Sequence, residues 1–394
     1  MALRNPFSRI ATLVALRNPL TPRRTLGLTT VESMGEPVRD WETDFDVGDA
    51  LYETDPYAIW DELRTSCPVP HTERRGGAFL TTRYEDTVAV ARDVEHFSSR
   101  DVGVLPTKDG SSLLVAPPIT SDPPFHTEAR RILLAYFSPK VIALLEEKTH
   151  SICTELLDAL DGRPTADAAA DYAQHIPVRI IAHMLGIPEA DEEQFTGWAI
   201  RLFQESSQDT EVNAATIREV LAYFDEQVTR RRAERSDDLI SALIDTELGG
   251  APLTQKHLLG TCFLLLLAGI DTTWSGIGAS LWHLATHPND RDRLVAEPEL
   301  METAVEEFLR AYSPVTMARV ATSDTEISGC PVHSGDKVYL SFPAANRDPE
   351  VFDRPDEVIL DRRQNRHVAF GVGIHRCLGS NLARMEMRVA IEAW

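Results

Sequence analysis

Lysine is scarce in this 394-residue chain, which has only five lysines among its 39 basic residues. Basic residues are also too few to balance the 61 acidic ones, so the formal net charge is −22. Because nucleic-acid binding depends on an excess of Lys and Arg near phosphates, this balance excludes a general nucleic-acid binder. The other figures, 43% hydrophobic and 25% charged residues, are those of an ordinary globular protein.

Cysteine and long apolar runs are sparse too. The five cysteines are scattered at positions 67, 153, 262, 330 and 377 and form no Cys-x-x-Cys pair. This pattern argues against a structural zinc site and a disulfide framework, and favours a reducing, cytoplasmic location. The longest apolar run, Cys262 to Ile270, is far shorter than the roughly 20 residues of a membrane helix. We therefore expect a soluble protein with no membrane partner.

The N-terminal segment differs in charge from the rest. Residues 1–31 contain five Arg and no acid, whereas residues 40–49 are acidic. We predict a disordered or leader-like extension over residues 1–33. A transit peptide, a twin-arginine signal at Arg23-Arg24 without its apolar region, and a true start at Met34 are the alternatives. No long linker follows, so residues 34–394 are predicted to form a single domain.

Helical periodicity dominates this domain. The pattern predicts helices over residues 56–63, 84–93, 126–137, 139–160, 169–185, 192–203, 212–232, 237–247, 254–286, 302–312 and 378–394. Strand-like stretches are few and short, at 78–82, 319–321, 325–327 and 337–341. The predicted fold class is mainly α with small β-sheets.

The most informative segment is Phe370–Gly379, which reads Phe-Gly-Val-Gly-Ile-His-Arg-Cys-Leu-Gly. Gly371 and Gly373 permit backbone conformations, and a close approach to a flat ligand, that a side chain resists. Cys377 stands just before a predicted helix, whose unpaired N–H groups stabilise a thiolate, a natural iron ligand. A buried structural cysteine is the alternative. A dinucleotide loop is excluded, because Arg376 takes the place of the third glycine.

A second polar segment, Ala268-Gly269-Ile270-Asp271-Thr272-Thr273, lies inside the predicted helix 254–286. The residues before it are apolar on all sides, so the stretch is expected to be buried. Glycine costs about 1 kcal/mol against alanine in a helix, and buried Asp and Thr need partners. The combination favours a locally opened helix with a hydroxyl and a carboxylate facing a cavity. A polar kink satisfied by its own backbone is the alternative.

Two charged pairs have helical spacing. Glu307 and Arg310 are three apart and share one face, which is also the spacing of a solvated surface pair. His126 and Arg130 are four apart, where together they can grip a carboxylate; an exposed basic turn is the alternative.

Together, and in this order, these motifs resemble the soluble bacterial class of cytochrome P450, the haem-thiolate monooxygenases. The resemblance runs from about Asp40 to the end and includes Asn346-Arg-Asp-Pro349 followed by Phe352-x-x-Pro355. It implies the α-rich fold of that family, with haem b between the long central helix and the Cys-loop helix. The family normally continues with a β-hairpin after that last helix, so residues 34–394 are expected to form a domain that lacks it.

The resemblance implies roles around the haem iron. It makes Cys377 the axial thiolate ligand, with Phe370 and Gly371 beside it. Thr272 is implied to hydrogen-bond dioxygen and Asp271 to supply protons. Ala268 and Gly269 are implied to leave room for dioxygen.

The resemblance also implies how the cofactor and the fold are held. The cationic clamp for the haem propionates is expected to consist of His126, Arg130, Arg319 and His375. Glu307 and Arg310 are expected to form a buried network with residues 346–355, which is critical for the fold and not catalytic.

The implied reaction is a hydroxylation-type insertion of one oxygen atom from O2 into an organic substrate, with two electrons supplied. The chain has no motif for its own electron supply, so a ferredoxin and a ferredoxin reductase are expected to pass electrons from NAD(P)H. Six Arg against two acids in residues 361–388 predict a basic patch for an acidic ferredoxin. Chance clustering in an Arg-rich chain is the alternative. We expect a monomer.

Substrate contacts are expected, by resemblance, from residues 102–119, 195–212, 264–272 and 315–318. These stretches are mainly apolar, with Leu105, Leu113, Leu114, Val115, Val315 and Met317, so a hydrophobic small molecule is expected. Two other functions stay open. One is a non-catalytic haem-binding remnant, because the chain stops inside the last predicted helix. The other is a peroxide-driven haem-thiolate enzyme, against which the Asp271-Thr272 proton relay argues.

Overall fold

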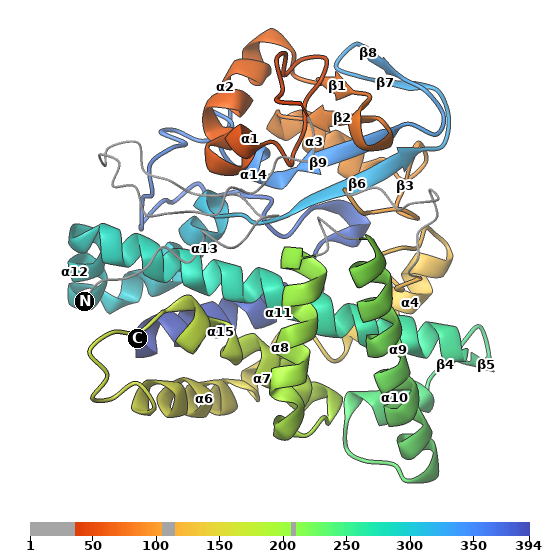
Figure 1. Ribbon diagram of the computed structural model, residues 1–394, viewed down its shortest axis with the longest axis vertical. Coiled ribbons are helices and arrows are strands. Elements are labelled where there is room, and N and C mark those ends of the chain that lie inside the picture. Colours follow the sequence, from red (N-terminus) through yellow and green to blue (C-terminus); the bar gives the residue numbers. More distant parts are fainter. Residues whose placement is uncertain (1–35, 105–114, 206–209) are drawn as a thin grey trace.

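The structure is a computed structural model that describes residues 36–104, 115–205 and 210–394. The predicted extension over residues 1–33 lies outside the described residues. Figure 1 shows two parts: a sheet with small helices at the top, and a helical part below it, with α11 (Gln255–Thr286) running across the middle. The prediction of a mainly α fold with small sheets is confirmed.

The larger sheet has five strands in the order β1-β2-β9-β6-β3. Strands β2 and β9 are parallel, with Phe79 opposite Val338, and the other neighbours are antiparallel. Among the described residues, the strands of this part are β1 (His71–Thr72), β2 (Ala78–Thr81), β3 (Phe97–Ser98), β6 (Thr316–Ala321) and β9 (Lys337–Ser341), with the hairpin β7 (Thr325–Ile327) and β8 (Cys330–Val332). Helices α1 (Ala50–Thr54), α2 (Pro56–Ser66), α3 (Tyr84–Arg92) and α14 (Phe342–Ala345) lie with them.

The helical part surrounds α11. Its described elements are α4 (Phe125–Leu134), α5 (Pro139–Ala143), α6 (Glu146–Asp158), α7 (His175–Leu185), α8 (Glu192–Ile200), α9 (Thr210–Ala233), α10 (Leu239–Ile244), α12 (Pro288–Ala296), α13 (Met301–Ala311) and α15 (Ser380–Ala393), with the hairpin β4 (Glu247–Leu248) and β5 (Ala251–Pro252). One apolar cluster joins these helices and contains fully buried Ile180, Ile270 and Val389. Burying such side chains contributes about 1.5–3 kcal/mol each, so this cluster is what holds the helices together.

Helix α11 begins where the sequence predicts. The Thr254 hydroxyl caps it by accepting the His257 N–H at 3.2 Å. This helix is also long and apolar enough to cross a membrane, a property that the length of the unbroken apolar run did not reveal. However, 67% of its most apolar stretch is buried inside the protein, as in a core helix.

Some predicted boundaries are wrong. The predicted helix 139–160 is two helices, because the Leu144 and Leu145 amides bond to carbonyls three residues back and tighten the chain. The predicted helix 169–185 begins as a π-turn over Ala169–Ala173. Helix α12 was not predicted, since its sequence is polar nearly all round and lacks an apolar stripe.

Candidate functional site

The Cys377 loop has the backbone conformation that its glycines permit. Gly371 and Gly373 have φ of +64° and +75°, a region that favours glycine. A Cβ on Gly373 would lie 2.8 Å from the Ala91 carbonyl oxygen of α3, so a side chain is excluded by space as well. The Cys377 N–H donates to the Phe370 carbonyl at 2.7 Å and closes the loop. Helix α15 then begins at Ser380, three residues after the cysteine.

Cys377 is the one exposed cysteine among the described residues, so the structure contradicts the buried structural alternative. Protein atoms nevertheless crowd it. Burial raises the pKa of its thiol, while a backbone hydrogen bond from Gly379 and the charges of Arg130, Arg376 and Arg384 lower it. A thiol that is accessible and surrounded by cations is suited to act as a metal ligand.

Four basic side chains that were predicted to act together do lie close together. His126 and Arg130 come from α4, Arg319 from β6 and His375 from the Cys loop. The His126 and His375 rings are 4.2 Å apart. Arg130 donates to the Arg376 carbonyl, which ties α4 to the loop. His126 is only 2% exposed, so the alternative of an exposed basic turn is wrong.

This basic cluster is poorly compensated within the part of the chain that the structure describes. Both ring nitrogens of His126 and the Nε2 atom of His375 have no hydrogen-bond partner there. Arg319 is buried and donates to its neighbour's carbonyl, that of Ala318. Burial lowers the pKa of Arg319 to about 10, and burial with the charges of Arg319, His126 and Arg130 lowers that of His375 to about 3. Such a cluster is completed by anionic oxygen atoms.

Helix α11 passes the Ala268–Thr273 segment without a break, so the prediction of a locally opened helix is wrong. Instead, the Thr272 hydroxyl donates back to the Ala268 carbonyl at 3.1 Å, a local bond that helical Thr readily makes. Ala268 is exposed, and Leu264 and Thr272, one turn to either side, are half-buried. The accessible side of this buried helix is therefore a stripe at four-residue spacing.

Asp271, next to Thr272, is different. It is 1% exposed, and neither carboxylate oxygen has a hydrogen-bond partner in the described part of the chain. Burial raises its pKa to about 7. The side chain therefore exchanges a proton near neutral pH, which an exposed aspartate does not.

Gly269 has a packing role in the structure. A Cβ there would lie 2.7 Å from Ile181 on α7. The absent side chain thus allows α7 and α11 to approach closely, a reason that differs from the expected room for dioxygen.

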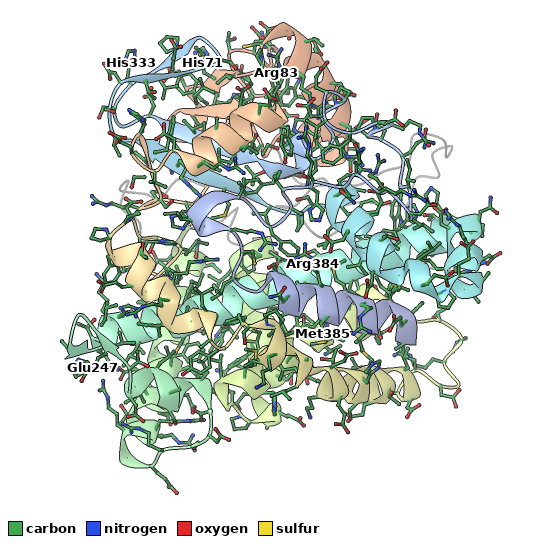
Figure 2. All side chains as sticks on the ribbon, turned by 180° about the vertical axis from the view of Figure 1, so that it is seen from behind. His71, Arg83, Glu247, His333, Arg384 and Met385 are labelled. Carbon is green, nitrogen blue, oxygen red and sulfur yellow. The ribbon has the colours of Figure 1, made fainter. Side chains whose placement is uncertain are left out.

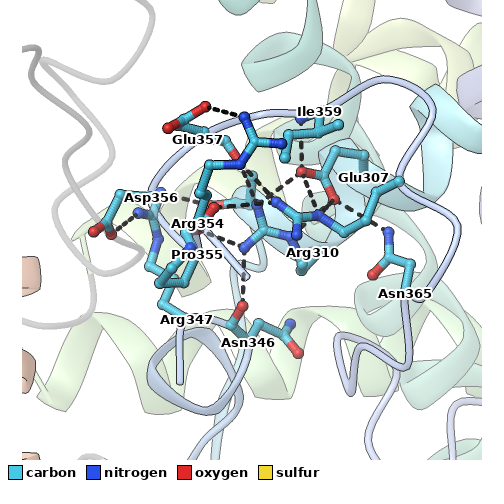
Figure 3. A network of polar contacts seen from close by, with 12 residues as sticks. Glu307, Arg310, Asn346, Arg347, Arg354, Pro355, Asp356, Glu357, Ile359 and Asn365 are labelled. Carbon is cyan, nitrogen blue, oxygen red and sulfur yellow. Dashed lines mark hydrogen bonds and ion pairs between the residues drawn. The ribbon is translucent and has the colours of Figure 1, made fainter. Parts of the chain in front are cut away.

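Glu307 and Arg310 lie at the centre of a buried polar network (Figure 3). Both are 0% exposed, which excludes the solvated pair, and two bonds of 2.8 Å join them. Arg310 also donates to the Asn346 and Pro355 carbonyls at 3.0 and 2.7 Å. Arg362 also donates to both Glu307 oxygens. The sequence did not identify Arg362 as a partner of Glu307, because several other arginines stand near Arg362 in the chain.

The predicted basic patch over residues 361–388 is smaller than the sequence count suggests. Three of its six arginines have carboxylate partners, namely Arg362 with Glu307, Arg384 with Glu306, and Arg388 with Glu146 and Glu392. Exposed arginines without an ion pair in the described residues are Arg363, Arg366 and Arg376. The difference arises because the sequence cannot tell which cations find acids on distant elements.

The residues expected to contact substrate are placed only in part. Leu105, Leu113 and Leu114, and the part of segment 195–212 at 206–209, lie outside the described residues. Val115 is 41% exposed, and Val315 and Met317 are half-buried on or beside β6.

Known proteins are similar to this chain in sequence and in fold. Residues 193–393 match the family model described as cytochrome P450. The polyketide biosynthesis cytochrome P450 PksS of Bacillus subtilis is 32% identical, over 87% of this chain and 88% of its own length. The vitamin D(3) 25-hydroxylase of Pseudonocardia autotrophica is 34% identical over 88% and 87%.

A solved structure of a Bacillus megaterium protein, CYP109E1 in complex with testosterone, superposes with a TM-score of 0.78 at 30% identity, covering 86% of this chain and 89% of that one. A family-model match over half of the chain, with relatives at this identity over nearly their whole length, shows common descent. The chain therefore belongs to the cytochrome P450 family of haem-thiolate monooxygenases.

Proposed function

We propose that this protein is a haem-thiolate monooxygenase that inserts one oxygen atom from O2 into a hydrophobic small molecule. The observation that carries the proposal is the uncompensated cluster of His126, Arg130, Arg319 and His375 beside an accessible cysteine. Haem b offers two carboxylates and an iron atom, which suit those two features.

The residues fit this cofactor. Cys377 would bind the iron as a thiolate, and the four basic side chains would hold the propionates. Haem so ligated supplies oxygen activation, because the thiolate donates electron density that favours O–O cleavage. The exposed Ala268 presents only a methyl group on the accessible stripe of α11, which leaves room there.

Thr272 and Asp271 would transfer protons during the reaction. The Thr272 hydroxyl, which donates to the Ala268 carbonyl, keeps its oxygen lone pairs free to accept one hydrogen bond while it rotates to donate another. Asp271 holds a proton at Oδ1 or Oδ2 below about pH 7 because it is buried. Asp271 precedes Thr272 in the chain, and as a neutral carboxyl it would be the proton source for that hydroxyl.

Electrons would come from a ferredoxin and its reductase, and so indirectly from NAD(P)H. The docking surface consists of the exposed Arg363, Arg366 and Arg376 next to the Cys loop. Opposite charges steer such encounters, so a strong decrease of the reduction rate with salt is expected.

The substrate would be a hydrophobic small molecule. Several accessible positions around α11 and β6 are apolar, namely Leu264, Ala268, Val315 and Met317. One relative is named for vitamin D(3) and one related structure holds testosterone, which are molecules of this kind. We also propose that the protein is a soluble cytoplasmic monomer. The burial of most of α11 inside the fold supports its being soluble.

The testing experiment begins with the spectrum of the dithionite-reduced, CO-bound protein, with Cys377→His as control. The thiolate-type Soret band is expected for the wild type and not for the variant. Failure of the wild type to bind haem would refute the proposal.

Substrates are then screened by spin-state shift, and turnover is measured with NADPH, ferredoxin and reductase. Thr272→Ala is expected to consume NADPH at a similar rate but to release hydrogen peroxide instead of hydroxylated product. If Thr272→Ala leaves product formation unchanged and peroxide alone supports turnover, the enzyme is peroxide-driven.

A further inference from the structure

A second charged cluster adjoins the Cys loop at Phe370 and has no role in the function proposed above. Arg384 of α15 donates through Nη2 to Glu306 Oε2 of α13 at 2.8 Å, and through Nε to Oε1. His367 Nε2 lies 2.9 Å from the same Oε2 atom. The Ala369 N–H donates to His367 Nδ1 at 3.2 Å, so the imidazole proton is on Nε2 and points at Glu306. Figure 2 shows Arg384 at the start of α15, leaving the helix on a different side from the core residue Met385.

The bonds to Glu306 and the contact with Phe370 hold the Arg384 guanidinium in one place. Arg384 lies over the Phe370 ring, with its central carbon 4.5 Å from the ring centroid. Its Nη1 also donates to the Ser380 carbonyl at 3.3 Å. A planar guanidinium that makes two parallel bonds to a carboxylate and stacks on a ring has little rotational freedom.

Phe370 connects this cluster to the cysteine. Its carbonyl accepts the Cys377 N–H at 2.7 Å, so the residue under Arg384 is the one that closes the loop. Although burial opposes it, Arg384 and His367 together hold the pKa of Glu306 at about 2, so Glu306 is ionised and compensates the arginine at working pH.

We propose that Arg384 is a positioning residue for the Cys377 loop. Glu306 and His367 hold it over Phe370, and the charge-compensated pair of Arg384 and Glu306 sets the electrostatic potential at the thiolate. The proposal rests on Cys377 being the haem ligand. It assigns opposite electrostatic effects to two residues that touch each other.

The test is the midpoint reduction potential of the haem-loaded protein. Glu306→Gln removes a negative charge and leaves Arg384 uncompensated, which favours the reduced form and raises the potential. Arg384→Gln removes a positive charge and lowers it. Because both side chains are about 30% exposed and solvent screens them, we expect shifts of three- to tenfold in the reduction equilibrium, where tenfold is about 59 mV. The double variant is expected to return close to the wild-type potential.

Arg388→Gln is the matched control. Arg388 is one turn further along α15, has a similar exposure and is paired with Glu146 at 2.6 Å, but it has no contact with the Phe370 ring among the described residues. The reduction equilibrium constant of this variant is expected to differ from that of the wild type by less than twofold. Arg384→Lys keeps the positive charge without the planar stack, and is expected to keep the wild-type potential. If Arg384→Gln does not fold, an unchanged potential in Arg384→Lys together with a raised potential in Glu306→Gln tests the electrostatic effect.

Shifts of the same sign, or no shift, in Glu306→Gln and Arg384→Gln overturn the proposal, since a purely structural pair would lower stability in both without opposite potentials. A wild-type protein that shows the thiolate-type CO spectrum while these shifts fail overturns this inference alone. A wild type without that spectrum overturns the proposed function and this inference with it.

Discussion

The imidazole rings of His126 and His375 lie 4.2 Å apart, with three of their four nitrogens lacking a hydrogen-bond partner in the described part of the chain. One buried and one half-buried ring with open nitrogen positions, next to Arg319 and Arg130, are arranged for an anion and not for each other. This relationship connects the Cys loop to α4 and predicts that the basic cluster retains haem.

Arg319→Gln should weaken retention of haem. The guanidinium is buried and donates to the Ala318 carbonyl, so its loss would remove a charge-assisted bond to a haem propionate, worth about 1.5–3 kcal/mol. We expect haem loss to excess apomyoglobin to become at least about tenfold faster. Arg100→Gln is the control, because that side chain is 82% exposed beside Asp122. Equal rates for wild type and Arg319→Gln would contradict the clamp.

Asp271→Asn should make stability less dependent on pH. The pKa of Asp271 rises from 3.8 to about 7 on folding, so the folded state binds the proton more tightly than the unfolded state. The wild type therefore loses stability as pH rises from about 4 to about 7, by up to about 4 kcal/mol, and the neutral amide avoids this loss.

Denaturant unfolding of the two proteins at pH 5 and pH 8 measures the difference. The variant is expected to gain relative to the wild type at both pH values, and to gain about 2–3 kcal/mol more at pH 8 than at pH 5. A difference between the two proteins that is the same at both pH values would show that the carboxyl does not titrate in this range.

Glu307→Gln should be severely destabilising. The carboxylate is 0% exposed and is bonded to Arg310, Arg362 and the Ile359 N–H, so the amide leaves two buried guanidinium groups without a counter-charge. Breaking a buried pair in this way costs about 3–5 kcal/mol. Arg354→Gln, on the exposed rim of the same network, is expected to cost less than about 1 kcal/mol. Unfolding midpoints that do not separate the two variants would argue against a central role for Glu307.

Gly269→Ala and Gly278→Ala compare two positions of the same helix. The first places a methyl group 2.7 Å from Ile181, whereas the second meets only Ala169 at 3.9 Å, an ordinary contact. We expect Gly269→Ala to cost about 1–3 kcal/mol through overpacking. Gly278→Ala should be neutral or stabilising by up to about 1 kcal/mol through helix propensity.

Ile181→Ala removes both atoms that the new side chain meets, Cδ1 and Cγ1, so Gly269→Ala combined with Ile181→Ala should cost less than the sum of the two single substitutions. Thermal melting of the wild type, the two single variants and the double variant gives the comparison. Additive effects of the two substitutions would mean that the contact between α7 and α11 is not the cause.

Features encoded within a few neighbouring residues could be predicted from the sequence. Glycines at 371 and 373 predicted the special backbone of the loop, and both have positive φ. Apolar periodicity predicted α11 to within one residue at its start, with Thr254 as its cap. The order of the motifs predicted the family, since those residues lie in a fixed order along the chain.

Features that depend on partners distant in the sequence were decided by the tertiary structure alone. Arg362, counted as surface charge, is buried against Glu307, and Arg384 is paired with Glu306 of another helix. Gly269 proved to be a packing glycine because Ile181 of α7 lies against it. Backbone conformation and helical periodicity arise from short-range sterics, which the local sequence states. The choice of charge partners and the space next to a glycine arise from elements that only folding brings together.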